Sequence, residues 1–328
     1  MEKGIRLTVL LMAYKRKDFI KEALMSILNQ TIPRSEYEII CITGFKDEDL
    51  SSFMRQNNII ELFDDTTLGS RLVTGLNRSS GDIIVFMDDD DLFRNDKLEK
   101  VINAFDQTGC IYFHNNVQLI DRNSKNIFES IEPYDKQIKN TMVWYPLRRF
   151  KNIIKHRGDF NMSSIAVLKT EICKYNDIFP DIDASPDSII FFLLLQANKP
   201  FFFSTEKLTM YRIHDSETNM SKDREKAKEI SLRYYNSRLT CYQGIADVKV
   251  KKLFLGYLLD SKFGAFIAGL KELKPTYREI FRLLYMGVTR PSAFYLRLSI
   301  AALIYGMFPE YVERIKYERT IKKYKGVK

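Results

Sequence analysis

Four consecutive carboxylates are the most distinctive chemical feature of the sequence. Asp88–Asp91 directly follow the apolar run Ile83–Met87. Packed carboxylates repel one another, and burial raises the pKa of each carboxyl group unless a cation compensates. Carboxylate oxygens are ligands that both Mn²⁺ and Mg²⁺ accept. The cluster therefore predicts a divalent-cation site, with an acidic, solvated turn before a helix as the structural alternative.

The elements around this cluster alternate between two hydrophobic patterns. Apolar, β-branched runs predict strands at residues 5–12, 37–43, 58–63 and 82–87. One-sided apolar patterns predict helices at residues 18–30, 69–79 and 95–107. This alternation is typical of an α/β fold with a parallel, doubly wound sheet. Ligands of such sheets bind at the carboxyl ends of the strands, where Asp88 is expected to lie.

The pattern changes after Gly109. Shorter, aromatic strand-like pieces follow at residues 110–115, 117–121 and 126–131, so the sheet is expected to become mixed. Beyond Lys222 the patterns are almost wholly helical. The sequence thus predicts a domain at residues 1–221, with parts 1–108 and 109–221, and a helical region at residues 222–328.

Composition excludes several classes of protein. With 45% hydrophobic residues, 14 Gly and 9 Pro, the chain is neither disordered nor built of repeats. Its four cysteines are scattered without a C-x-x-C pair, which predicts reduced thiols in a cytoplasmic protein. The apolar run at residues 7–13 is too short to span a membrane and lacks a cleavage site, so we expect a buried strand there.

Several segments, in order, resemble the family 2 glycosyltransferases of the GT-A fold. Residues 8–14 and 19–31 resemble the opening strand and helix of that family, and Asp88–Asp91 resemble its D-x-D signature. Gly69–Gly81 resembles the helix before that signature, and Tyr211–His214 resembles a closing Y-R-x-H segment. The resemblance implies a Rossmann-like GT-A fold, with a mixed, mainly parallel sheet flanked by helices. The helical C-terminal appendage has no counterpart in it.

The resemblance, which covers about residues 5–221, also implies a reaction. This is the metal-dependent, inverting transfer of one sugar from a nucleoside-diphosphate sugar to an acceptor hydroxyl. A cation bound to the leaving diphosphate stabilises the negative charge that develops there. The Q-x-x-R-W segment of processive synthases is absent from the sequence, which favours single transfer. A glycan or a lipid-linked molecule is the expected acceptor.

The same resemblance implies the site residues by position. The nucleotide-sugar site is expected to include Ala13, Tyr14, Thr43, Gly69, Arg71, Asp88 and Asp89. The cation, Mn²⁺ or Mg²⁺, is expected at Asp90, with Asp89 or Asp91 assisting and His214 as a further ligand. Arg212 would contact phosphate or pair with a neighbouring acid. For His214, a hydrogen-bonded structural role is the alternative.

One carboxylate is expected to take the proton of the attacking hydroxyl. The resemblance aligns Asp187 with the acidic pair that begins a helix in the family. Direct attack assisted by this base inverts the anomeric carbon. Asp183 and Asp181 are the alternative bases, and capping of the helix is the structural alternative for Asp187.

Two positions depart from the family pattern. Thr43 lies where the family usually has an Asp that reads the base, and Asp47 is too displaced to replace it. Thr43 can still hydrogen-bond a uracil or guanine edge, which leaves the donor base open. A UDP-sugar is the favoured partner, and a GDP-sugar is the alternative. Pro186 stands where the family commonly has Glu, which leaves the acceptor open.

The net charge of the chain suits nucleic acid, anionic lipid or a phosphorylated substrate, and the distribution of the charge along the chain favours a membrane surface. The net charge is +9, and Lys and Arg are concentrated at residues 313–328. Residues 293–308 are apolar but interrupted by Arg297, a pattern typical of a helix in a bilayer interface. We expect peripheral attachment to the anionic cytosolic face of a membrane. A helical subdomain or a homo-oligomer interface is the alternative.

Two other functions are weighed against this prediction. A nucleotidyltransferase ordinarily has a glycine-rich phosphate loop after its first strand, whereas residues 14–17 contain no glycine. A non-enzymatic, basic protein that binds lipid or nucleic acid would leave Asp88–Asp91 without a role. Both are therefore less favoured than a glycosyltransferase.

Overall fold

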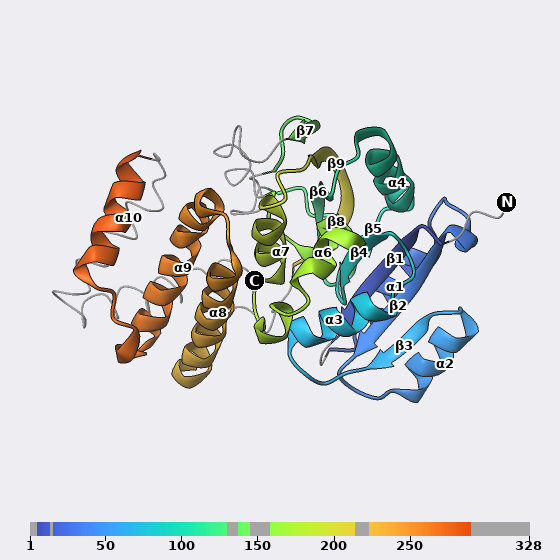
Figure 1. Cartoon of the computed structure of the whole chain (residues 1–328). Coiled ribbons are helices and arrows are strands. Elements are labelled where there is room, and N and C mark those ends of the chain that lie inside the picture. Colours follow the sequence, from blue (N-terminus) through green and yellow to red (C-terminus); the bar gives the residue numbers. More distant parts are fainter. Residues whose placement is uncertain (1–4, 14–15, 130–136, 145–157, 214–222, 290–328) are drawn as a thin grey trace. The chain divides into compact units, whose positions relative to one another are not determined.

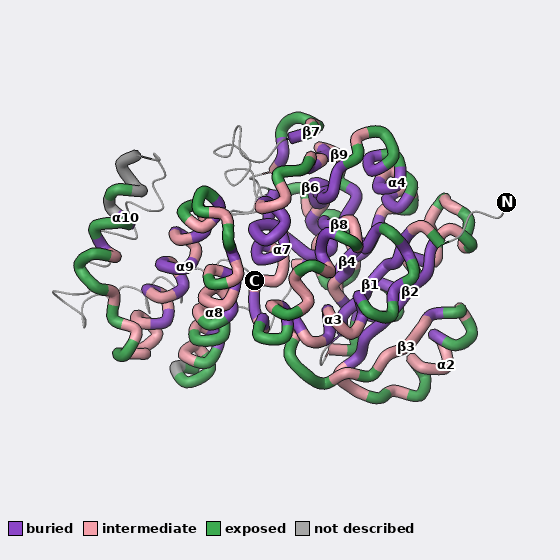
Figure 2. Tube along the Cα trace, in the orientation of Figure 1, coloured by how far each residue is buried: buried purple, intermediate pink, exposed green. Residues whose placement is uncertain are grey.

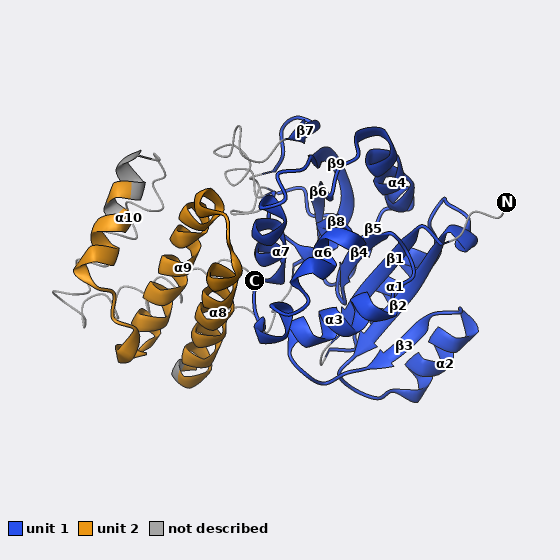
Figure 3. Ribbon diagram, viewed as in Figure 1, with its two compact units in different colours: residues 1–216 blue, residues 217–328 orange. Residues whose placement is uncertain are grey.

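The computed structural model describes residues 5–13, 16–129, 137–144, 158–213 and 223–289 (Figure 1). The chain divides into two compact units, Met1–Ser216 and Glu217–Lys328 (Figure 3). Unit 1 contains the sheet, and the described part of unit 2 consists of helices and their connections. The division lies close to residue 221, where the composition of the sequence changes.

Unit 1 is built around one nine-stranded sheet. Its strands are β1 (Leu7–Ala13), β2 (Tyr37–Thr43), β3 (Ile60–Phe63), β4 (Ile83–Asp88), β5 (Leu92–Phe93), β6 (Tyr112–Ile120), β7 (Met142–Trp144), β8 (Ile165–Leu168) and β9 (Phe201–Arg212). Their order is β3-β2-β1-β4-β8-β6-β9-β5, and β7 pairs with β9. The first four strands run parallel, whereas β8 is antiparallel to both β4 and β6. The predicted mixed sheet is confirmed.

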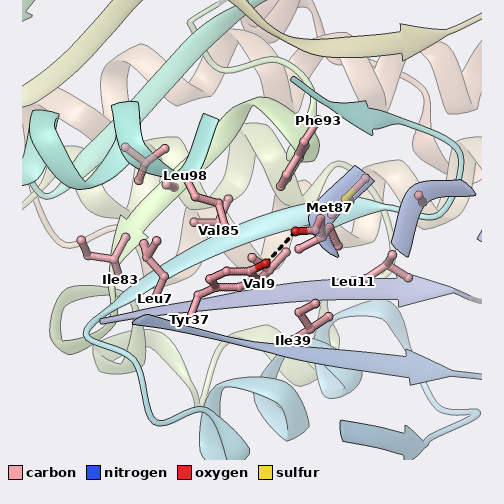
Figure 4. Close-up of a cluster of buried hydrophobic side chains, with 14 of the residues drawn as sticks. Leu7, Val9, Leu11, Tyr37, Ile39, Ile83, Val85, Met87, Phe93 and Leu98 are labelled. Carbon is pink, nitrogen blue, oxygen red and sulfur yellow. Dashed lines mark hydrogen bonds between the residues drawn. The ribbon is translucent and has the colours of Figure 1, made fainter. Parts of the chain in front are cut away.

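Helices cover both faces of the parallel strands. The described helices of unit 1 are α1 (Ile20–Leu28), α2 (Glu48–Gln56), α3 (Leu68–Arg78), α4 (Lys97–Thr108), α6 (Lys169–Ile172) and α7 (Pro186–Leu195). On one face, Leu7, Val9 and Leu11 join a core cluster with buried residues of α1 and α4 (Figure 4). On the other face, Leu10 lies against Gly75 of α3. Alternate residues of β1 thus face two helical layers, as a doubly wound sheet requires.

The central parallel strands are buried along their whole length. Every residue of β1 and β2 is buried (Figure 2). Strands that helices cover on both faces need apolar side chains on both faces, which explains the continuous apolar runs. Two of the polar exceptions satisfy each other, since the hydroxyl of Thr8 donates to the carboxylate of Glu38 at 2.6 Å. These buried strands give rigid support to the residues at their carboxyl ends.

The structure corrects three details of the predicted elements. The pieces expected at residues 110–115 and 117–121 form one strand, β6, whose register with β9 shifts midway. Within the described part of residues 126–131, pairing is limited to one bridge between Asn126 and Ile120. Helix α2 and strand β5 have no predicted counterpart. The apolar stripe of α2 is short, since it consists of Leu50, Phe53 and Met54, and only Met54 is fully buried.

Gly69 lies at a close approach between α3 and the segment before α7. Its N–H donates to the carbonyl oxygen of Ile182 at 2.8 Å. An added Cβ atom would overlap the carbonyl oxygen of Phe179. Gly69, expected in the nucleotide-sugar site, therefore has a packing role that by itself requires glycine.

The described part of unit 2 is helical, as the pattern beyond Lys222 predicts. Its helices are α8 (Arg224–Gly244), α9 (Val248–Ala268) and α10 (Tyr277–Thr289). An ion pair of 3.1 Å between Arg238 and Asp260 joins α8 to α9. Among the described residues, none of the helices has the length and apolarity needed to cross a bilayer. The expected membrane-binding segments at residues 293–308 and 313–328 lie outside the described residues.

Candidate active site

The carboxyl ends of β1, β2 and β4 meet at one edge of the sheet. Ala13 pairs with Thr43, and Met12 pairs with Asp88. Because β1 lies between β2 and β4, the order of strands reverses here, and such a switch point forms the ligand crevice of doubly wound sheets. The structure thus brings Ala13, Thr43 and Asp88 together as expected. Tyr14 lies outside the described residues.

The acidic cluster is largely shielded from solvent at this edge. Asp89 and Asp91 are 7% and 1% exposed, and Asp88 is partly exposed. Burial raises the pKa of Asp88 well above its usual value, and the charges of Asp91, Asp90, Asp89 and Asp187 raise it further. Burial and the charge of Asp90 raise the pKa of Asp91 to about 7. The cluster therefore favours a bound positive charge.

Arg16 supplies part of that positive charge. Its guanidinium forms ion pairs with Asp89 and, at 2.7 Å, with Asp90. Arg16 follows β1, so the first strand delivers a cation to carboxylates at the end of β4. Sequence reasoning missed this pairing, and the only signal was the basic run at residues 15–17 directly after the strand.

Arg212, at the end of β9, supports the cluster from another element. Its N–H donates to the Asp91 carboxylate at 3.0 Å, and its Nε donates to the carbonyl oxygen of Asp90 at 2.7 Å. The buried guanidinium also pairs with Glu22 at 2.8 Å and lies 4.3 Å from the ring centroid of Phe19. These contacts agree with the ion-pairing alternative for Arg212, which here fixes the backbone of the cluster.

Asp187 lies in the first turn of α7, near the acidic cluster. Its Oδ2 accepts from the N–H of Asn161 at 3.0 Å, and its Oδ1 accepts from the N–H of Ser188 at 2.8 Å. Its negative charge is among those that raise the pKa of Asp88, after burial and the charges of the cluster itself. Asp187 therefore combines contacts typical of a helix cap with a position close to the cluster.

The two alternative bases have different surroundings. Asp183 Oδ1 accepts from the N–H of Leu68 at 3.3 Å, at the beginning of α3. Asp181 lies in the turn Phe179–Asp181 and is exposed.

A 3-10 turn, Met162–Ser164, connects the acidic cluster with Asp187. The Ser163 hydroxyl accepts from the N–H of Asp88 at 2.9 Å, and the Ser163 N–H donates to the side chain of Asn161 at 3.1 Å. Asn161 has a φ of 69°, a left-handed conformation that asparagine tolerates better than most residues. Lys97 donates to the carbonyl oxygen of Ser163. Sequence reasoning missed this turn, because no pattern marks it.

The carboxylates fit a cation that is shared with a substrate phosphate. In the described ranges, no group of three His, Cys, Asp or Glu side chains is arranged as a closed metal cage. Protein-bound Mg²⁺ is commonly held by one or two carboxylates together with substrate phosphates and water. Asp90 can supply such a carboxylate at the end of β4. His214 lies outside the described residues.

Thr43 offers a hydrogen-bonding group at the same edge. Its side chain is 1% exposed, and within the described structure its hydroxyl has no hydrogen-bond partner. A buried hydroxyl without a partner destabilises the fold, so a ligand group at this point would satisfy it. Arg71, the other expected contact, is buried within α3 at 3% exposure.

Comparison with known proteins identifies the family. A model of glycosyl transferase family 2 matches residues 8–174, just over half of the 328 residues, and the chain belongs to this family of enzymes. A glycosyltransferase of Rickettsia bellii is 32% identical over 131 residues, covering 38% of this chain and 19% of the relative. Glycosyltransferase AglE of Haloferax volcanii is 25% identical over 143 residues, covering 41% of this chain and 47% of the relative. The matches span less than half of either relative.

Solved structures share the fold. TarS of S. aureus, in complex with UDP-GlcNAc, aligns with a TM-score of 0.56 at 14% identity, covering 90% of this chain and 91% of that chain. The mannosyltransferase PcManGT of Pyrobaculum calidifontis, in complex with GDP-Man and Mn²⁺, aligns with a TM-score of 0.54 at 13% identity. The alignment covers 94% of this chain and 88% of that chain. At such low identity, the likeness establishes the GT-A fold. The family assignment removes the nucleotidyltransferase and the non-enzymatic protein as alternatives.

Proposed function

We propose that the chain transfers one sugar from a nucleoside-diphosphate sugar to an acceptor hydroxyl, with a divalent cation and with inversion. The supporting observation is that hydrogen bonds through the turn Met162–Ser164 connect Asp88, at the end of β4, with Asp187 of α7. Glycosyl transfer needs a site for the leaving diphosphate and a base for the acceptor. The acidic cluster serves as the site for the leaving diphosphate, and Asp187 serves as the base for the acceptor.

The donor binds across the carboxyl ends of β1, β2 and β4. The hydroxyl of Thr43 receives the edge of the base, and Asp88 receives the ribose. Arg16, already beside Asp89 and Asp90, adds positive charge near the diphosphate. Mn²⁺ or Mg²⁺ at Asp90, when bound, stabilises the negative charge that develops on the leaving diphosphate.

The acceptor hydroxyl attacks the anomeric carbon from the side opposite the diphosphate. Asp187 takes the hydroxyl proton as the new carbon–oxygen bond forms and the sugar–phosphate bond breaks. The N–H groups of Asn161 and Ser188 orient its carboxylate. One displacement inverts the anomeric configuration and releases a nucleoside diphosphate.

A UDP-sugar is the favoured donor and a GDP-sugar is the alternative. TarS has been solved with UDP-GlcNAc and with UDP, and PcManGT with GDP-Man, so the shared fold accommodates both bases. A glycan or a lipid-linked molecule is the proposed acceptor. The basic segment at residues 313–328 would hold the enzyme on the anionic cytosolic face of a membrane, at about 1 kcal/mol for each Lys or Arg near the surface.

Thermal unfolding with a panel of nucleotide sugars tests this proposal. We expect a UDP-sugar with Mn²⁺ to raise the melting temperature, because a ligand at 100 times its Kd stabilises the folded state by about 2.7 kcal/mol. The same donor in EDTA should stabilise less. If no nucleotide sugar changes the melting temperature in Mn²⁺, the proposed donor class is wrong.

A further inference from the structure

A buried lysine supports the turn that links the two halves of the proposed site. Lys97, Ser163 and Thr209 are fully buried. The Lys97 amine donates to the carbonyl oxygen of Ser163 and, at 2.8 Å, to the hydroxyl of Thr209. It also lies 3.8 Å from the ring centroid of Phe93. Because lysine is rarely buried completely, this placement points to a specific task.

Two side chains donate to the same carbonyl oxygen. The Thr209 hydroxyl donates to the carbonyl oxygen of Ser163 at 2.8 Å, beside Lys97. Asn115 donates to the Thr209 oxygen at 3.0 Å, which leaves the hydroxyl proton of Thr209 directed at Ser163. Since these groups are buried, water does not compete for the bonds. The peptide of Ser163 is thereby fixed from both α4 and β9.

From this peptide, hydrogen bonds reach both proposed functional carboxylates. The Ser163 hydroxyl accepts from the N–H of Asp88 at 2.9 Å. In the other direction, the Ser163 N–H donates to Asn161 at 3.1 Å, and the Asn161 N–H donates to Asp187 at 3.0 Å. Asp88 is also fixed by the pairing of β4 with β1. A disturbance of the turn should therefore displace Asp187 more than Asp88.

We propose that Lys97 is a positioning residue, which orients Asp187 through Ser163 and Asn161. The inference rests on the proposed role of Asp187 as the base. A base displaced by about 1 Å loses roughly 10²-fold in rate, because proton transfer requires close alignment with the acceptor. Lys97 lies beneath the turn, and the charge of Asp91 also acts on its amine, so the loss of Lys97 should lower turnover more than donor affinity.

Lys97→Met and Thr209→Val each remove one donor to Ser163 with little change in volume. We expect Lys97→Met to lower kcat by roughly 10–100-fold, with a smaller change in donor Kd. Thr209→Val should have a smaller effect of the same kind, and Thr209→Ser, which keeps the hydroxyl, should restore turnover. Lys169→Met is the matched control, because Lys169 also donates to a backbone carbonyl, that of Ser79, at the opposite end of β4.

A double-mutant cycle separates positioning from a general structural role. If Lys97 acts through Asp187, then Lys97→Met lowers kcat much less in the Asp187→Asn background than in the native chain. Equal losses in both backgrounds would overturn the proposal, as would native kcat in both Lys97→Met and Thr209→Val. If Lys97→Met fails to fold, the cycle with Thr209→Val decides. The proposed function fails in a different way, namely if the native chain turns over no donor.

Discussion

Asp187→Asn is expected to lower the rate of sugar transfer by roughly 10²–10⁴-fold, with nearly unchanged donor affinity. The amide cannot take the proton of the attacking hydroxyl. The oxygen of the amide can still accept from the N–H of Asn161, as the carboxylate does at 3.0 Å, but the amide group loses the second acceptor, which serves the N–H of Ser188. Initial rates at saturating donor measure the rate of sugar transfer, and calorimetric titration of the donor measures its affinity.

Asp183→Asn is the matched control, because Asp183 accepts from Leu68 at the beginning of α3. Its transfer rate should stay close to that of the native chain. A large loss in Asp183→Asn, with native transfer in Asp187→Asn, would make Asp183 the base. If Asp187→Asn loses activity only in proportion to unfolded protein, its helix-capping contacts explain the loss.

Asp90→Ala is expected to abolish the cation dependence of donor binding while the chain remains folded. The weakening in Mn²⁺ should be roughly 100-fold, corresponding to about 3 kcal/mol for the lost charged contact. Arg16 keeps its ion pair with Asp89 in this variant, so the end of β4 retains a contact with the segment after β1. Calorimetric titration of the donor in Mn²⁺ and in EDTA measures the change.

Asp106→Ala is the control for the loss of a carboxylate elsewhere in unit 1. Asp106 pairs with Arg6 at 2.5 Å and its side chain is 51% exposed. Exposed ion pairs contribute about 0–1 kcal/mol, so donor binding should not change. Native, Mn²⁺-dependent affinity in Asp90→Ala would remove Asp90 from the cation site.

The parallel half of the sheet could be predicted because both of its faces are covered. Burial on both faces produces continuous apolar runs, and β2 occupies the predicted residues 37–43. The meeting of Ala13, Thr43 and Asp88 then follows from topology, because the carboxyl ends of parallel strands share one edge. Composition and order along the chain therefore indicated the acidic edge of the crevice.

The groups that balance the charge at this edge could not be predicted in the same way. Arg16 and Asp89 are 73 positions apart, and local periodicity carries no information about such pairs. Lys97 is the first residue of an amphipathic helix, a position that usually faces solvent, yet it is fully buried beneath Ser163. Tertiary packing decides both placements, so only the folded chain shows them.

The products of donor turnover test the central claim most directly. Phosphorus and proton NMR spectra can follow the native chain with a nucleotide sugar and Mn²⁺, with water as a slow acceptor in place of the natural one. We predict the signals of a nucleoside diphosphate, together with a sugar whose first detected anomer is inverted relative to the donor. Release of pyrophosphate, or a first product that retains the donor configuration, would contradict the account.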